Sequence, residues 1–167
     1  MATVKSQIAS QLQSTKSLSI SSSWLDSFVA SSSASLQRNV PISALTQTAL
    51  FRVLASDFRD TLTAKDPSSL LPVDIFNVNV KERRLAGPIP LQVLDIEDIG
   101  TSLWSQVEAR ENNTGVGDNS NGPHRVILQD AAGIRAVAIE LHRIHGLAIG
   151  KLQIGAKLIL RDATIAR

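Results

Sequence analysis

The fold of this chain is decided by residues 125–161, RVILQDAAGIRAVAIELHRIHGLAIGKLQIGAKLILR. Two short apolar runs in this stretch, Val126–Leu128 and Val137–Ile139, flank the turn residues Asp130–Gly133. Apolar runs separated by a short turn are typical of a β-hairpin, and Gly133 can take the positive φ that such a turn often needs. The stretch therefore predicts two paired antiparallel strands.

Two further runs predict extended strands on either side of the hairpin. In Ala156–Asp162, Leu158 and Leu160 alternate with residues that would point to the other side of a sheet. Leu91–Ile96 alternates in a similar way and is expected to be the first strand. Together these runs predict a small antiparallel β-barrel.

The N-terminal half is patterned for helices. Apolar side chains recur at helical spacing in Val4–Leu12, Trp24–Val29 and Pro41–Thr63. The last of these predicts one long helix, capped by Ser43 and stopped by Lys65–Pro67. We expect its aromatic side chains to lie in a core between helices.

The linking segments divide the chain into two parts. Leu70–Val80 predicts an extended segment, and Lys81–Arg84 predicts a charged, solvated turn. The Gly and Pro residues that follow predict a boundary. The expected fold class is α+β, with a helical module and linker over 1–86 and an OB-fold barrel over 87–167.

A long polar segment interrupts the predicted barrel. Thr101–Glu108 is either a helical turn or a continuation of the first strand. Arg110–His124 is rich in Asn and Gly and has no apolar period, so it predicts a loop longer than a barrel connection needs. Such a loop is either a binding element or disordered. A small barrel with a long first loop is typical of an OB-fold.

Composition excludes several classes of function. The chain has 167 residues, 43% of them apolar and 19% charged, as in a globular protein. It has no cysteine, and no apolar run reaches the roughly 18 residues of a membrane span. The net charge is only +2, so the pI of 9.3 is weak evidence for nucleic-acid binding.

No catalytic or cofactor motif is visible. His142 and His145 give a His-x-x-His pair without a third ligand at zinc-like spacing. The acidic residues Asp95, Glu97 and Asp98 predict a solvated strand end rather than a metal or acid–base site. We therefore expect no enzyme activity, no cofactor, no metal site and no small-molecule substrate.

OB-folds that bind single-stranded nucleic acid use aromatic platforms and a basic groove. After Phe76 the only aromatic residue is Trp104, and the predicted strands contain none. The barrel is therefore expected to contact protein, or to contact phosphates through basic residues alone. The candidate basic residues are Lys81, Arg83, Arg84, Arg125, Arg143, Lys157 and Arg161.

Most of the chain from Ser21 onward resembles the N-terminal region of the family of RecQ-mediated genome instability protein 1, and is closest to fungal members. The matching stretches are SSSWLDSFV (21–29), ALFRVLASDFRDTL (49–62), SLLP (69–72), LQVLDIEDIGTSLWSQVEARE (91–111), VILQDAAGIRAVAIEL (126–141) and IGAKLILRDATIAR (154–167). The order, a helical module followed by an OB-fold, carries the resemblance.

The resemblance implies a nuclear, non-catalytic subunit that binds topoisomerase III and a RecQ-family helicase, with DNA contacted directly or through the complex. Such subunits support double Holliday junction dissolution in DNA recombination, repair and replication. The family's loop after the first strand reaches into the topoisomerase gate, and its Gly-x-Lys, here Gly155–Lys157, belongs to the partner surface. The implied topoisomerase contacts are Arg110, Glu111, Asn112, Asn113, Val116, Pro123, His124 and Lys157; nucleic-acid contacts would be Arg125, Arg143 and Arg161.

Two departures from the family pattern bear on the fold and the loop. The family's barrel has a fifth strand that would begin just past Arg167, so the barrel is expected to lack its last strand. The loop sequence shares little with relatives, so its role carries over by position alone. Tudor-domain proteins with a similar module pair with another topoisomerase III isoform, but no tudor segment is visible here.

Overall fold

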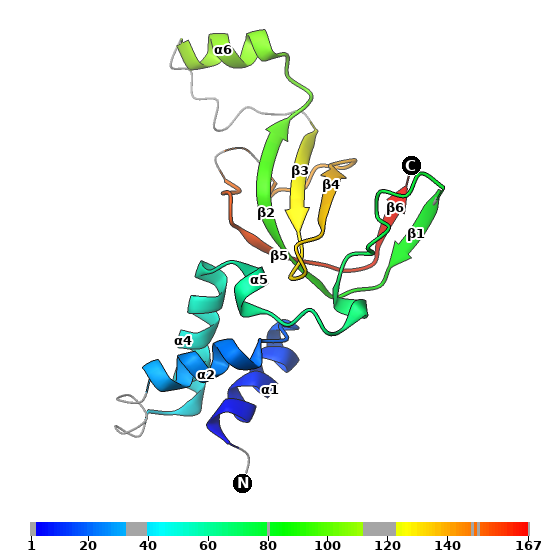
Figure 1. Ribbon diagram of the computed structural model, residues 1–167. Helices are drawn as coiled ribbons and strands as arrows, with labels where there is room; N and C mark the ends of the chain where they lie inside the picture. Colours follow the sequence, from blue (N-terminus) through cyan, green and yellow to red (C-terminus); the bar gives the residue numbers. More distant parts are fainter. Residues whose placement is uncertain are drawn as a thin grey trace. The chain divides into compact units, whose positions relative to one another are not determined.

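The computed structural model describes residues 3–32, 40–79, 81–111, 123–147, 149 and 151–166 (Figure 1). Its contacts divide the chain into two compact units. The first comprises Met1–Leu91, Asp130–Ile134 and Ile159–Arg167, and the second comprises Gln92–Gln129 and Arg135–Leu158. The first unit thus holds the N-terminal helices, and the second holds most of a four-stranded sheet.

Helix α1 (Val4–Lys16) packs against α2 (Ser22–Ser31) and α4 (Ile42–Ala55) in the first unit. The helices predicted over 4–12 and 24–29 are confirmed. Apolar side chains of all three helices meet in one buried core, because each helix carries an apolar stripe at helical spacing. The buried members on these helices are Ile8, Leu12, Leu25, Phe28, Leu45, Ala49 and Val53.

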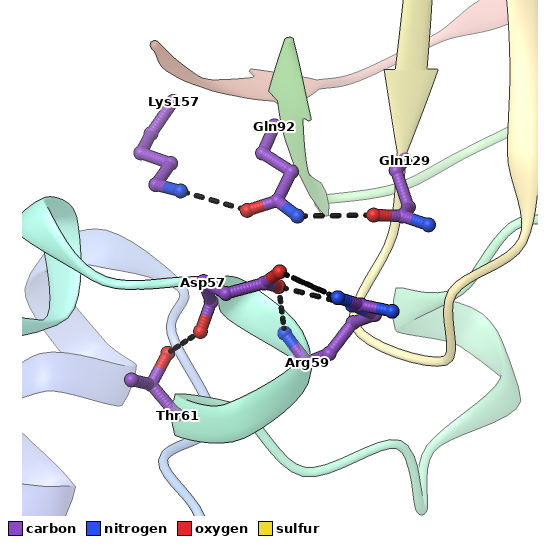
Figure 2. Close-up of polar contacts among 6 residues, drawn as sticks. All are labelled: Asp57, Arg59, Thr61, Gln92, Gln129 and Lys157. Carbon is purple, nitrogen blue, oxygen red and sulfur yellow. Dashed lines mark hydrogen bonds and ion pairs between the residues drawn. The ribbon is translucent and has the colours of Figure 1, made fainter. Parts of the chain in front are cut away.

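The prediction of one helix over 41–63 is wrong. The chain leaves helical geometry at Ser56, where φ is −110° and ψ is 170°, and a short helix α5 (Phe58–Thr61) follows. Asp57 starts α5 by accepting the backbone N–H of Arg59 at 2.8 Å and its guanidinium at 2.9 Å (Figure 2). The predicted cap, Ser43, lies inside α4 instead.

The break and the helical period together decide which aromatic rings are buried. Phe58, after the break, is 1% exposed and joins the core. Phe51 is 74% exposed, so the expectation of a core position is wrong for this residue. The reason is geometric, because Ala49 and Val53 face the core and Phe51, two residues from each, points to the opposite side.

A four-stranded sheet has the order β4-β3-β2-β5. Its strands are β2 (Ile89–Asp98), β3 (His124–Gln129), β4 (Arg135–Ile139) and β5 (Lys157–Leu160). Strands β3 and β4 pair antiparallel, and Gly133 has a φ of 88°, so the predicted hairpin is confirmed. Strands β2 and β3 are also antiparallel, with a register shift between Val93 and Asp95. Helices followed by antiparallel sheets are the α+β arrangement expected of an OB-fold.

A separate strand pair joins the segment predicted as a charged turn to residues that follow β5. Strand β1 (Glu82–Leu85) pairs antiparallel with β6 (Ala163–Ala166), so the prediction of a charged turn over 81–84 is wrong (Figure 1). The extended segment predicted over 70–80 is also wrong, because residues 73–76 form a turn. Non-local pairing, which a local pattern does not report, produces β1. The predicted boundary between residues 86 and 87 and the missing last strand stay predictions.

The hairpin turn is organised by one buried carboxylate. Asp130 is 0% exposed, and its Oδ1 accepts the N–H groups of Ala132 and Ile134 at 2.9 and 2.8 Å. Its Oδ2 accepts the N–H of Leu71 at 2.9 Å, from a segment 59 residues away. Ala131 beside it is buried in the helical core. The carboxylate therefore ties the turn to the segment that precedes β1.

We expect Asp130→Ala to lower the free energy of unfolding by about 2–4 kcal/mol, because it leaves the buried N–H of Leu71 and two turn N–H groups without their acceptor. Urea unfolding followed by circular dichroism measures this loss. Asp66→Ala is the matched control, since the exposed Asp66 also accepts bonds from a nearby backbone N–H and hydroxyls. Equal losses for the two variants would contradict the assignment.

Candidate functional site, the insertion between strands β2 and β3

The candidate site is the insertion between the end of β2 and the start of β3. It begins with helix α6 (Leu103–Glu111) and returns through Pro123 (Figure 1). Of the alternatives for 101–108, the structure therefore has a helix. The predicted site residues Asn112, Asn113 and Val116 lie outside the described residues.

The predicted limits of the loop, 110–124, are wrong at both ends. Arg110 and Glu111 belong to α6, and the Glu111 side chain is exposed. His124 is the first residue of β3 and is 0% exposed. Pro123 is exposed. Of the loop contacts expected from the resemblance, His124 is therefore a structural residue at the base of the insertion.

Asp98 fixes the outgoing end of the insertion. Its Oδ1 accepts the N–H groups of Gly100 and Thr101 at 2.8 and 3.0 Å, and its Oδ2 accepts the Thr101 hydroxyl at 2.8 Å. Ser102 then caps α6, since its Oγ accepts the N–H of Ser105 at 3.2 Å. The expectation of a solvated acidic strand end is wrong for Asp98, which is 4% exposed.

Glu140 fixes the returning end. Its Oε2 accepts from the His124 backbone N–H at 3.2 Å and from Nδ1 of the same ring at 2.6 Å. Its Oε1 accepts the N–H of Ile144 at 2.6 Å. The two ends also meet directly, because the N–H of Ile99 donates to the Pro123 carbonyl at 3.0 Å. We call the set Asp98, Thr101, His124 and Glu140 the stem.

Hydrogen bonding keeps both stem carboxylates ionised. Burial raises the pKa of Asp98, but the bonds from the Thr101 hydroxyl and from the N–H groups of Gly100 and Thr101 outweigh it and lower the pKa. The N–H of Ile144 is the largest cause that lowers the pKa of Glu140; burial opposes it, and the bonds from His124 reinforce it. An ionised Glu140 only accepts, so Nδ1 of His124 carries the proton in their bond.

Helix α6 presents apolar side chains to solvent. Leu103 is 76% exposed, Trp104 is 78% exposed and Val107 is 46% exposed. Positions separated by three or four residues lie on one side of a helix, so Val107 continues the side formed by Leu103 and Trp104. These three residues are not among the predicted site residues, although their spacing within TSLWSQVE was the available signal.

The predicted contact Lys157 ends a chain of polar side chains in the sheet. Its Nζ donates to Oε1 of Gln92 at 2.7 Å, and Nε2 of Gln92 donates to Oε1 of Gln129 at 3.1 Å (Figure 2). Gln92 and Gln129 are each 4% exposed and face each other across β2 and β3. The Lys157 side chain is half-buried, so its charge lies at the margin of this buried chain.

The predicted nucleic-acid contacts have different surroundings. Arg125 forms an exposed ion pair with Glu97. Arg161 belongs to the first unit and donates to Oγ of Ser17 at 3.3 Å. Arg143 is exposed in the second unit. The structure therefore does not define one basic groove from these three residues.

The residues that the structure describes show no metal-binding cluster of three or more His, Cys, Asp or Glu side chains. His142 and His145 are both exposed. Among the described helices, none combines the length and the hydropathy needed to span a bilayer.

A folded pKa below the unfolded value means that a carboxylate stabilises the fold at neutral pH, and that this contribution is lost as the pH falls through the folded pKa. The ordinary values are 4.5 for Glu140 and 3.8 for Asp98. We therefore expect the Tm to fall as the pH drops below about 4.5. Glu140→Gln should cost about 1–3 kcal/mol at neutral pH, and less in acid.

Thermal unfolding of both proteins across this pH range measures the effect. Glu97→Gln, which breaks an exposed ion pair on β2, is the control and should have little effect. If the difference in Tm between wild type and Glu140→Gln did not change with pH, the ionised Glu140 carboxylate would not be what stabilises the stem.

Two family models match the chain. The model described as RMI1, N-terminal helical domain, matches residues 12–61, and the model described as RMI1, N-terminal OB-fold domain, matches residues 71–167, which is more than half of the chain. No curated protein matches the sequence. The two domains are those of a non-catalytic OB-fold subunit that acts in nuclear genome maintenance. The chain therefore belongs to the RMI1 family, that of RecQ-mediated genome instability protein 1.

Proposed function

We propose that this chain binds a type IA topoisomerase III and, together with a RecQ-family helicase, supports the dissolution of double Holliday junctions in the nucleus. The observation that carries the proposal is the match to both RMI1 domains, in their order along the chain. In this proposal the chain performs no chemistry. It changes the rate at which the topoisomerase gate opens and closes.

The insertion between β2 and β3 is the proposed contact with the gate. Its stem supports this role, because the bonds of Asp98 and Glu140 fix both ends of the insertion to adjacent strands. Because its two ends are fixed, the insertion can change in sequence and conformation without disturbing the strands of the sheet. The fixed ends also lower the conformational entropy that would be lost on binding.

Helix α6 supplies the proposed apolar part of the contact. Trp104 and Leu103 are each more than three-quarters exposed, which leaves a large apolar area in water in the free chain. Tryptophan is enriched among the residues that dominate protein–protein affinity, because it buries a large surface with few rotatable bonds. We propose Arg110 and Glu111 as the polar residues of this contact and Pro123 as a further apolar one.

We propose that Lys157 makes a second contact with the topoisomerase, through its positive charge. Because its Nζ is engaged by Gln92, its side chain is held in place before a partner binds.

Direct binding of single-stranded DNA is the second candidate function. Exposed Arg125 and Arg143, both in the second unit, favour it. Two observations oppose it. Arg125 is already paired with Glu97, and the strands carry no aromatic side chain on which a base could stack. We therefore propose that DNA reaches this protein mainly through the complex.

Replacing residues 103–122 by a short glycine-rich turn should leave the fold intact and abolish the effect of the chain on decatenation by topoisomerase III. The fold is expected to survive because Asp98, Thr101, His124 and Glu140 are all retained. Decatenation of linked DNA circles, with and without the chain, measures this. Unchanged stimulation would show that the insertion is not the contact.

A triple variant, Leu103→Ser with Trp104→Ser and Val107→Ser, tests the apolar part of the same contact without changing the loop length. We expect the affinity for topoisomerase III, measured by co-elution at a series of concentrations, to fall by about tenfold or more. A loss of this size is typical when a central aromatic residue of an interface is removed. Lys65→Gln, an exposed change in the helical unit, is the control.

The second candidate function predicts that fluorescence anisotropy of labelled single-stranded DNA rises with the concentration of the isolated chain and falls steeply with salt. We expect no such binding at physiological salt. Salt-dependent binding that is lost in Arg125→Gln with Arg143→Gln would instead establish direct DNA contact.

A further inference from the structure

The helical part of the first unit carries a surface pocket of about 410 Å³ between α2 and α4. This volume lies in the range of ligand-binding pockets. The α2 wall contains Trp24 and Phe28, whose rings stack with centroids 5.5 Å apart and planes 8° apart. The α4 wall contains Phe51 and Ala55, and Phe51 is 74% exposed. The pocket is therefore aromatic on both sides and open to solvent.

Arg52 is the only charged residue among the described residues that line this pocket. Its guanidinium lies over the Phe28 ring at 5.3 Å from the centroid, and Nη1 donates to Oγ of Ser31 at 3.0 Å. These two contacts fix the planar cation against the aromatic wall. Its remaining N–H groups can donate hydrogen bonds to a ligand, since arginine carries five such donors.

No carboxylate in the described part of the chain forms a salt bridge with Arg52. The acidic groups on neighbouring elements are engaged elsewhere, because Asp26 pairs with Lys5 at 2.5 Å and Asp57 pairs with Arg59 at 2.9 Å. Three other arginines, in contrast, each pair with a carboxylate: Arg83, Arg84 and Arg125. The pocket thus joins exposed aromatic surface to an uncompensated positive charge.

We propose that this pocket binds an acidic, amphipathic peptide segment of another protein. An aromatic or large aliphatic side chain of the segment packs between Trp24 and Phe51, and a neighbouring carboxylate accepts hydrogen bonds from Arg52. Grooves between two helices commonly bind such segments through apolar anchors. A nucleic acid fits less well, because a single cation cannot follow a phosphate backbone. The site lies on the helical unit and does not depend on the proposed topoisomerase contact.

A random peptide library selected on the whole 167-residue chain, followed by fluorescence titration of the enriched peptides, tests the proposal. The chain has two tryptophans, so Trp104→Phe leaves Trp24, in the pocket, as the only reporter. We expect enriched peptides to combine an aromatic or large aliphatic residue with Asp or Glu, and to change Trp24 fluorescence. Arg52→Gln and Phe51→Ser should each weaken binding about tenfold or more.

Lys65→Gln is the control, because it removes a positive charge from an exposed position outside the pocket lining and should leave affinity unchanged. Arg52 and Phe51 are both exposed, and circular dichroism should show their variants to be folded. Enriched peptides without acidic residues, or equal binding to Arg52→Gln, would overturn the proposal. So would an absence of enrichment. Dimerisation of the chain that Arg52→Gln abolishes would overturn it in favour of a second copy as the occupant.

Discussion

The hydrogen bonds of the Asp130 carboxylate are the constraint on which much of this structure depends. A β-hairpin turn can form from local sequence alone, but its position in a larger fold needs a non-local contact. Asp130 provides both, because one oxygen closes the turn and the other holds the N–H of Leu71. These bonds matter for stability because the groups are buried. A buried N–H without an acceptor lowers the free energy of unfolding, whereas an exposed N–H can donate to water instead. Ala131, next in the chain, is consequently part of the helical core.

The same physical device recurs at the base of the insertion. Asp98 and Glu140 are buried carboxylates that accept backbone N–H groups, and their lowered pKa values follow from those bonds. Acceptors of this kind fix a chain path without demanding any particular sequence beyond the few residues that donate. The sequence of the insertion can therefore vary while its two ends stay at the same place on the sheet. That property suits an element whose proposed task is to contact a different protein.

The distribution of arginine contacts separates two kinds of surface. Arg59, Arg83 and Arg84 in the first unit form exposed ion pairs with carboxylates, and Arg125 does so in the second. Exposed ion pairs contribute little to stability. They neutralise the charge of each arginine, however, so the surface around them has little positive potential to attract nucleic acid. Arg52 lies instead against an aromatic ring in the helical unit. This difference, more than the net charge of +2, indicates where an acidic partner segment would bind.

The sequence by itself determined the elements whose cause is local. The apolar runs around Asp130–Gly133 determined the hairpin, and helical spacing determined α1 and α2, because side-chain period and turn chemistry act over a few residues. The sequence also determined the family, through its matches to both RMI1 domains. The tertiary structure alone decided the pairing of β1 with β6, the break at Ser56 and the burial of Asp98 and Glu140. The pairing of β1 with β6 and the bond of Glu140 to His124 join residues distant in sequence, which a local pattern cannot report. The bonds of Asp57 and Asp98 are local, but whether a helix ends or a carboxylate is buried at these positions depends on how the surrounding core packs.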